Sequence, residues 1–231
     1  MAPKVLVVLT SNDRIESANA PTGWYLPEFA HPWDVLSSKG VEVVTASPKG
    51  GKAPLDPSSV EMFKADESSA SFLKSQTALW EKTEPISSFL GKTSEFAGLF
   101  FPGGHGPMFD LAVDKESIAL INEFVAANKP VGAVCHGPAV FVNVTLPGGR
   151  HLLTGKEVTG FSNAEEEAVG LTKHVPFSLE DRIKEAGAIY KKAPELWAPY
   201  VLVADDGKLI TGQNPGSSKA VGEAFAKALG L

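Results

Sequence analysis

Residues 130–138 read Pro-Val-Gly-Ala-Val-Cys-His-Gly-Pro and contain Cys135, the only cysteine of the chain. The apolar residues Val131–Val134 predict a buried strand, and the His-Gly-Pro that follows predicts a sharp turn into an apolar, helix-like stretch. A strand-to-helix turn that exposes one reactive side chain is called a nucleophile elbow. The N-terminal dipole and free N–H groups of the following helix would favour the thiolate. This stretch therefore predicts a cysteine-dependent enzyme.

The composition is that of an ordinary globular protein. Of 231 residues, 43% are hydrophobic and 21% charged, and the formal net charge is −6, which fits one α/β domain with or without an inserted cap. The acidic charge and the lack of a basic patch argue against nucleic acid as a partner. A lone cysteine excludes an intrachain disulfide and fits a reducing compartment. We find no secretory signal and no apolar run near the ~20 residues that cross a bilayer, so we expect a cytoplasmic protein without a membrane partner.

The alternation of apolar runs and helical patterns predicts an α/β fold with a mostly parallel central sheet and helices on both faces. The expected strands are Val5–Leu9, Val41–Ala46, Ala97–Phe101, Val131–Val134, the weaker Lys156–Phe161 and Ala188–Lys192, and a hairpin of Tyr200–Ala204 and Lys208–Gly212. The expected helices are Trp24–Leu36, kinked at Pro32, then Glu116–Asn128 and Ser217–Leu229.

Residues 47–93 interrupt this alternation. They are rich in Ser, Lys, Glu and Pro and contain helical pieces such as Ser71–Glu81. The segment is too long for an ordinary connection and too apolar for a disordered linker. We expect it to be a small helical cap over the sheet edge, near the site, inserted into a single domain that spans residues 1–231.

A second turn with functional potential follows the strand that ends at Phe101. Its sequence, Pro102-Gly103-Gly104-His105-Gly106-Pro107, has two glycines that permit a tight turn with N–H groups facing a site, as an oxyanion hole requires. Neither GxxxxGK[ST] nor GxGxxG is present, which excludes a phosphate loop. His136 is the candidate base, or else it packs behind the elbow and contributes only its backbone N–H.

Two groups of acids are candidates for the same site. Glu28 lies at the start of the first crossover helix, where a solvated side chain is the alternative. Glu165, Glu166 and Glu167 follow Asn163, a potential helix cap, and at most one of the three is expected to turn inward. The five histidines show no HExxH pattern and one cysteine makes no thiolate cluster, so we expect no metal site.

With these motifs the chain resembles the ThiJ/PfpI family, and within it the branch of fungal heat-shock chaperones and glutathione-independent glyoxalase III enzymes. The resemblance covers essentially the whole chain and implies a flavodoxin-like sandwich. The stretches that carry it are Val5–Thr10, Glu28–Pro32, Phe101–Gly106, Ala133–Pro138, Val158–Phe161 and Thr211–Pro215.

The resemblance implies a catalytic triad of Cys135, His136 and an acid. In that branch the acid comes after Thr-Gly-Phe, which matches Glu166 best. Glu165 and Glu167 remain alternatives, because a run of three glutamates leaves the register ambiguous by one residue.

The resemblance also implies roles around the sulfur. Glu28 matches a family carboxyl beside the cysteine, where a protonated acid would donate to the thiolate and stabilise it. Gly103, Gly104 and the N–H of His136 match the oxyanion hole. Residues 47–93 match the cap that is typical of this branch.

The activity implied is that of a glyoxalase III type lyase, in the D-lactate dehydratase class, that works without glutathione, metal or other cofactor. It converts methylglyoxal and related 2-oxoaldehydes into 2-hydroxy acids such as D-lactate through a hemithioacetal on Cys135. His136 would move the substrate proton and Glu166 would orient His136. The partner is thus a small 2-oxoaldehyde, and because the family often forms dimers we expect a homodimer.

Other functions stay open on the sequence alone. One alternative is a stress-induced holdase chaperone that binds unfolded client proteins through apolar cap residues around Phe63, Phe72, Leu79 and Trp80. Another is a redox sensor in which Cys135 is oxidised. A cysteine peptidase, also seen in the family, would need an open cleft. Glutamine amidotransferases share the elbow but need a catalytic histidine further downstream.

Overall fold

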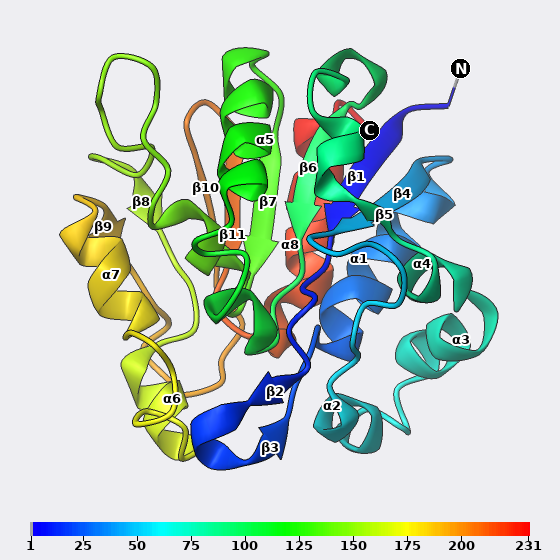
Figure 1. The fold of residues 1–231 in the computed structure, drawn as a ribbon, viewed down its shortest axis with the longest axis vertical. Helices are drawn as coiled ribbons and strands as arrows, with labels where there is room; N and C mark the ends of the chain where they lie inside the picture. The colour runs from blue at the N-terminus through cyan, green and yellow to red at the C-terminus, as the bar shows by residue number, and fades with distance from the viewer. Residues whose placement is uncertain (1) are drawn as a thin grey trace.

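A seven-stranded sheet forms the centre of the computed structural model, which describes residues 2–231. All neighbouring strands are parallel except the hairpin at one edge, and helices cover both faces (Figure 1). The predicted α/β class is therefore confirmed. In spatial order the strands are β10 (Val201–Ala204), β11 (Leu209–Gly212), β7 (Val131–Val134), β6 (Gly98–Phe101), β1 (Lys4–Val8), β4 (Glu42–Ser47) and β5 (Glu84–Pro85).

The helices lie between strands along the chain, singly or in groups of two or three. The α-helices are α1 (Leu26–Ser38), α2 (Pro57–Met62), α3 (Glu67–Ser75), α4 (Ala78–Glu81), α5 (Lys115–Ala126), α6 (Asn163–Ala168), α7 (Leu179–Glu185) and α8 (Ser218–Ala228). In Figure 1, α5 lies on the near face of the sheet, and α1 and α8, which pack against each other, lie behind it. A bilayer would need a longer and more apolar helix than any formed within residues 2–231.

The remaining strands form two small sheets apart from the central one. β2 (Arg14–Ile15) pairs with β3 (Ala20–Pro21), and β8 (Glu157–Val158) pairs with β9 (Ile189–Tyr190). The sequence predicts the second of these pairs as two weak strands. The structure shows that they pair with each other, outside the central sheet.

The parallel topology decides where the site forms. β1, β6 and β7 are adjacent and parallel, so their carboxyl ends lie at one edge of the sheet. The segments that leave this edge carry Gly103 after β6 and Cys135 after β7. The N–H of Tyr25, just before α1, donates to the carbonyl of Gly103 at 3.2 Å, which brings the start of α1 to the same place. Three distant stretches of sequence thus meet at one edge.

Helix α1 is continuous through Pro32, the position at which the sequence predicts a kink. Pro27 lies in the first turn, where the missing N–H is harmless, and Pro32 lies inside a helix that continues to Ser38. At this point α1 packs closely against α8, with Gly222 directly beside Pro32. A Cβ atom at position 222 would lie 2.8 Å from the Cα atom of Pro32.

Residues 47–93 contain α2, α3 and α4 and then add β5 to the edge of the central sheet beside β4. The side chain of Phe72 is fully buried, with its ring 4.8 Å from that of Phe29 and 5.5 Å from that of Trp33. Trp80 is only 8% exposed. Of the four side chains expected to form an apolar client-binding surface, Phe72 packs against α1 and Trp80 is buried, so the prediction is wrong for these two. The other two, Phe63 and Leu79, are half-buried, and for them the surface stays a prediction.

This aromatic contact leads to a stability prediction. Replacement of Phe72 by alanine is expected to lower the free energy of unfolding by about 3–5 kcal/mol, because it removes a fully buried ring and leaves a cavity between the segment and α1. Val113→Ala is the control, since Val113 is 62% exposed and its truncation should change stability by less than about 0.5 kcal/mol. Urea unfolding of the two variants measures both values. Equal midpoints for the two would contradict the prediction.

Candidate active site

Cys135 occupies a strained elbow at the end of β7. Its φ angle is +61°, a left-handed conformation that is uncommon for a side chain other than glycine. Two backbone hydrogen bonds hold it there: its N–H donates to Gly212 at 2.9 Å, and its carbonyl accepts from Phe161 at 2.8 Å. The turn after Cys135 passes so close to the end of β6 that only glycine fits at position 137. A Cβ atom there would lie 2.5 Å from the carbonyl oxygen of Phe101. The predicted elbow is thus present.

The helix after the elbow differs from the expected one. It is a single 3-10 segment, Gly137–Phe141, instead of a longer α-helix. A short segment gives little macrodipole, so the expected stabilisation of a thiolate from this source is small. The Cys135 side chain is also only 4% exposed.

His136 lies between the sulfur and a carboxylate. Its Nδ1 atom is 3.5 Å from the Sγ of Cys135, and its Nε2 atom is 2.6 Å from Oε2 of Glu166. Because a carboxylate only accepts hydrogen bonds, Nε2 carries the proton, and Nδ1 presents its lone pair to the thiol. The geometry is that of a nucleophile, a base and an acid that orients the base.

The structure separates the three consecutive glutamates. Glu166 is the one that contacts His136. Glu165 is buried elsewhere, where Oε2 accepts from the N–H of Ser162 at 2.9 Å, and Glu167 is exposed and accepts from Thr172. Successive residues on a helix point about 100° apart, so one side chain of the run faces the elbow.

A second histidine, which the sequence analysis did not assign to the site, lies against the same carboxylate. His105 Nε2 is 2.8 Å from Oε1 of Glu166, and the His105 and His136 rings are 4.1 Å apart between centroids. Glu166 therefore accepts one N–H on each oxygen. The Gly-Gly-His-Gly sequence was the available signal, because the same turn that presents the glycines also presents His105.

The protonation states follow from burial and neighbours. Burial, together with the His105 imidazole nearby, lowers the pKa of His136, so its ring is neutral at pH 7. Burial alone would raise the pKa of Glu166, but the adjacent His136 and His105 hold it well below its usual range. Glu166 is thus a carboxylate that accepts an N–H from the neutral ring of His136 and another from His105.

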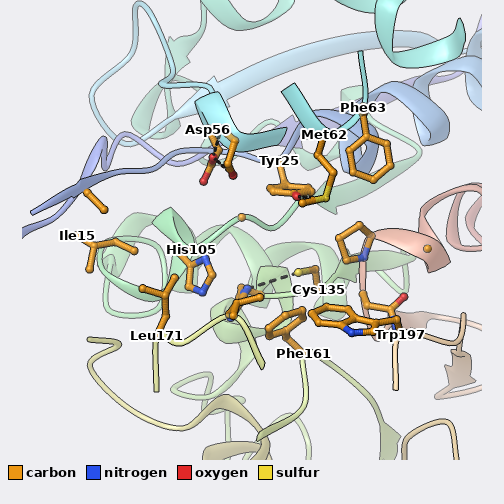
Figure 2. Close-up of a pocket in the computed structure, with 18 of the residues that line it drawn as sticks. Ile15, Tyr25, Asp56, Met62, Phe63, His105, Cys135, Phe161, Leu171 and Trp197 are labelled. Atoms are coloured by element: carbon orange, nitrogen blue, oxygen red, sulfur yellow. Dashed lines mark hydrogen bonds between the residues drawn. The ribbon is translucent and has the colours of Figure 1, made fainter. Parts of the chain in front are cut away.

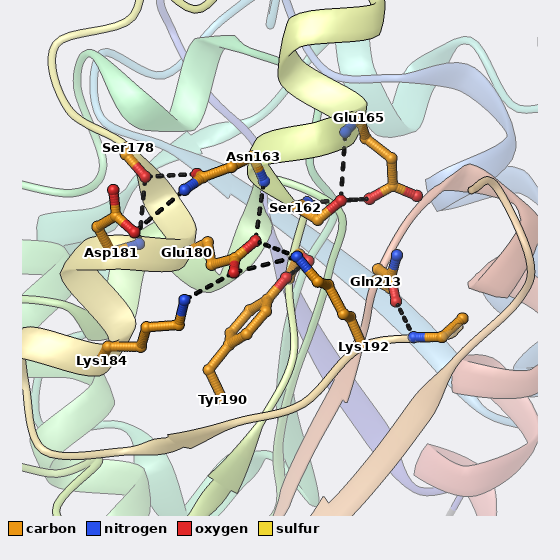
Figure 3. A network of polar contacts seen from close by, with 12 residues as sticks. Ser162, Asn163, Glu165, Ser178, Glu180, Asp181, Lys184, Tyr190, Lys192 and Gln213 are labelled. Carbon is orange, nitrogen blue, oxygen red and sulfur yellow. Dashed lines mark hydrogen bonds and ion pairs between the residues drawn. The ribbon is translucent and has the colours of Figure 1, made fainter. Parts of the chain in front are cut away.

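The start of α6 is held firmly, which fixes Glu166 three residues further on. Ser162 and Glu165 form a capping box, in which Ser162 Oγ accepts from the N–H of Glu165 at 3.2 Å. The N–H of Asn163 donates to Oε2 of Glu180 at 3.0 Å, and Glu180 also pairs with Lys184 and Lys192 (Figure 3). This network anchors the helix turn that carries the acid.

Glu28 is a buried acid beside the sulfur. Its Oε2 accepts the N–H of Gly103 at 2.7 Å, and its buried Oε1 has no nitrogen or oxygen partner within residues 2–231. Burial raises the pKa of Glu28 to about 8, against the smaller opposite effects of the Cys135 thiol and the Gly103 N–H. The carboxyl therefore carries a proton at pH 7.

The expected lowering of the cysteine pKa is not observed. Burial, and next the neighbouring Glu28 carboxyl, raises the pKa of the Cys135 thiol well above its usual value. A protonated Glu28 removes the repulsion between the two groups but does not restore the lost solvation of the sulfur. The resting nucleophile is therefore a thiol that must lose its proton as it attacks.

The glycine turn lies next to Cys135, and Glu28 occupies part of it. No side chain fits at Gly103, because a Cβ there would lie 2.6 Å from Oε2 of Glu28 and 2.7 Å from the backbone nitrogen of His136. Gly104 has a φ of +84°, which permits the turn. The N–H of Gly103, expected to face a substrate oxygen, donates to Glu28 instead.

A pocket of about 630 Å³ opens above these groups. Cys135, His136 and His105 lie at its base, and most of its other lining side chains are apolar. Figure 2 shows Tyr25, Met62 and Phe63 on one side of Cys135, and Phe161 and Trp197 on the other. The pocket places the sulfur where a small carbonyl compound can reach it.

His105, His136 and Glu166 are also the one group of donors within residues 2–231 that could hold a metal ion, since their ligand atoms lie within 4.8 Å of one another. The sequence does not indicate this group, because the three residues come from three separate segments. Both Nε2 atoms already share protons with Glu166, so an ion would have to replace two hydrogen bonds.

Comparisons with known proteins agree with the fold. The chain is 33% identical to glutathione-independent glyoxalase HSP31 of Saccharomyces cerevisiae, over 94% of each chain. The crystal structure of glyoxalase III from Candida albicans superposes with a TM-score of 0.87 at 27% identity, over 98% of this chain and 97% of that one. The 24 kDa rapid encystment protein of Francisella tularensis superposes with a TM-score of 0.85 at 36% identity, over 98% and 99%.

The match to the family itself extends over residues 22–228, which include the elbow, the glycine turn and Glu28. The resemblance inferred from the sequence motifs is confirmed by this match and by relatives that align over nearly the whole chain. The chain belongs to the DJ-1/PfpI family, which is also called ThiJ/PfpI.

Proposed function

We propose that the protein is a glutathione-independent glyoxalase that converts 2-oxoaldehydes, methylglyoxal among them, into 2-hydroxy acids. The observation that carries this proposal is the chain of contacts from Cys135 through His136 to Glu166 at the base of the pocket. A second support is the buried Glu28 carboxyl beside the thiol. Relatives that bear the name glyoxalase support the class of reaction.

In the first step, the Cys135 sulfur attacks the aldehyde carbon while His136 Nδ1, 3.5 Å away, takes the thiol proton. A carbon–sulfur bond forms, and the electron pair of the carbonyl moves to oxygen. Because the N–H groups of Gly103 and, more weakly, Gly104 interact with Glu28, the N–H group that we propose for this oxyanion is that of His136. His136 then returns its proton to the oxygen, which gives a neutral hemithioacetal.

In the second step, His136 removes the proton from the former aldehyde carbon, and Glu28 donates its proton to the neighbouring ketone oxygen to give an enediol. His136 next protonates the ketone carbon, and the hydroxyl proton on the sulfur-bearing carbon returns to Glu28. The product is a thioester of a 2-hydroxy acid on Cys135. Water hydrolyses it and regenerates the thiol.

The proposal gives the other parts of the fold supporting roles. Glu166 keeps the proton of His136 on Nε2, so that Nδ1 stays a base. Residues 47–93 act as a cap within a single α/β domain, since α2 supplies Met62 to the pocket wall. The homodimer and the cytoplasmic location remain predictions.

The direct test is an assay of the purified, reduced protein with methylglyoxal and no glutathione. We expect disappearance of the aldehyde together with formation of an equal amount of lactate, and chiral chromatography then identifies the enantiomer. Heat-denatured protein is the control for uncatalysed isomerisation. Consumption of methylglyoxal without lactate would mean adduct formation, and would reject the proposed activity.

The raised pKa of Glu28 predicts a pH dependence of this activity. The carboxyl is protonated below about pH 8 and ionised above it, so kcat/KM should be level near pH 7 and fall about tenfold per pH unit above pH 8. In Glu28→Gln the side chain cannot ionise, so the rate should be lower but show no break near pH 8. Glu167→Gln should keep the break. A break near pH 8 that survives in Glu28→Gln would assign it to another group.

A further inference from the structure

The pocket is much larger than methylglyoxal requires. Its volume of about 630 Å³ lies within the roughly 300–1,000 Å³ range of pockets that enclose drug-sized ligands. Methylglyoxal carries only a methyl group beside its two carbonyls, so it leaves most of this space to water. An apolar cavity gives water few hydrogen-bond partners, and an apolar ligand group that displaces this water gains free energy.

Apolar side chains line the pocket on both sides of the Cys135 sulfur. Tyr25 and Phe63 pack edge to face with centroids 6.0 Å apart on one wall. Phe161 and Trp197, with centroids 5.8 Å apart, form the other wall, and Phe161 in turn lies 4.4 Å from the ring of His136 (Figure 2). A substrate bound to Cys135 would therefore extend its side group between aromatic rings.

The polar groups of the pocket lie at its catalytic base or are already satisfied. Asp56 accepts from the N–H of Ser58 at 2.8 Å and from the hydroxyl of Thr22 at 3.3 Å. Among the described residues that line the pocket there is no lysine or arginine. An anionic or strongly polar side group would thus lose its hydration without gaining a partner.

Trp197 lines the pocket in a strained backbone conformation. Its φ angle is +67°, a genuine outlier for a bulky side chain, and strain of this kind is concentrated at functional sites. The loop is fastened by Asn214, whose Nδ2 donates to the carbonyl of Ala198 at 2.9 Å and to Oε1 of Glu165 at 2.8 Å. The indole is therefore positioned by the same network that positions the triad acid.

We infer that this pocket selects 2-oxoaldehydes that bear an extended apolar side group, and that Trp197 and Phe63 are specificity-determining residues for that group. The inference rests on the proposed function, since it names the substrate class of the same site. Methylglyoxal is then a poor member of the class, turned over because it shares the reacting carbonyls.

The test is a series of alkylglyoxals, from methylglyoxal through ethyl-, propyl- and butylglyoxal, assayed with the reduced protein. The reacting carbonyls are alike along the series, so differences in rate report the side group. Burial of each added CH₂ should raise kcat/KM by about fourfold. In Trp197→Ala and in Phe63→Ala, the rise in kcat/KM per added CH₂ should fall to about twofold or less. Val203→Ala, at an exposed position on β10 outside the pocket, should keep the full increment.

Binding of the same series to Cys135→Ala protein, followed by tryptophan fluorescence, gives a readout that needs no turnover. Affinity should also rise by about fourfold per CH₂. A flat series in both measurements would overturn the inference, and so would an increment that the two pocket variants leave unchanged. Rising affinity without 2-hydroxy acid from any member would instead reject the proposed function and retain the selectivity of the pocket.

Discussion

Replacement of Cys135 by alanine is expected to reduce kcat for lactate formation from methylglyoxal by at least about 10⁴-fold. The proposed reaction proceeds through a carbon–sulfur bond, and no other described side chain at the base of the pocket supplies a nucleophile at the same place. His136 alone could still act as a base, but without the hemithioacetal the substrate is not held for proton transfer. Steady-state lactate formation at several protein concentrations measures the loss.

The control for this variant concerns folding. Alanine has the same left-handed backbone requirement at position 135 as cysteine, so the melting temperature should stay within a few degrees of the wild type. Cys135→Ser offers a second comparison, because the hydroxyl keeps the hydrogen bond but is a weaker nucleophile. A folded Cys135→Ala protein with more than a few per cent of the wild-type rate would show that the chemistry does not need the sulfur.

Replacement of Glu166 by glutamine is expected to lower kcat by about 10²- to 10⁴-fold, with a much smaller change in KM. The carboxylate accepts an N–H from each of two imidazoles, and an amide has only one acceptor oxygen. If the amide nitrogen faces His136, it donates to Nε2, which moves the ring proton to Nδ1. His136 would then present a proton instead of a lone pair to Cys135, and could not take the thiol proton.

The neighbouring Glu167→Gln provides the matched control, because the same chemical change is made one residue away on an exposed side chain. Its kcat should stay within about twofold of the wild type. Nitrogen-15 NMR of the histidine rings gives a second readout, in which the tautomer of His136 changes in Glu166→Gln alone. A Glu166→Gln protein with a wild-type tautomer and a wild-type kcat would remove Glu166 from the mechanism.

The sequence alone was sufficient for the features that depend on local pattern. Four apolar residues followed by Cys-His-Gly-Pro predict a strand and a sharp turn, because β propensity and turn chemistry act over a few residues. The same holds for the hairpin at Asp205-Asp206-Gly207, where the structure has a positive φ at all three positions. The parallel order of the strands then explains why Glu28, the glycine turn and Cys135 lie near one another.

Packing decided what local pattern left open. A sequence of three consecutive glutamates does not show which of them faces the elbow. The hydrogen bonds of Ser162 and Glu180 fix the start of α6, and this orientation places Glu166 against His136. β5 is two residues long, too short to show a pattern, and is found beside β4 only in the structure, where the hydroxyls of Ser47 and Thr83 share a hydrogen bond of 2.7 Å. Phe72 and Trp80, which were expected on a surface, are buried because their rings pack against other aromatic rings.

The electrostatics of the site belong to the tertiary structure most of all. A helix terminus after Cys135 is visible in the sequence and favours a thiolate, but desolvation by the whole fold is larger and acts in the opposite direction. Burial likewise turns Glu28 from an ordinary carboxylate into an acid that keeps its proton at pH 7. The sequence by itself determined which residues carry the chemistry and on which turns they lie. Only the tertiary structure decided their charges and partners, because burial and contact sum over segments that are far apart in the chain.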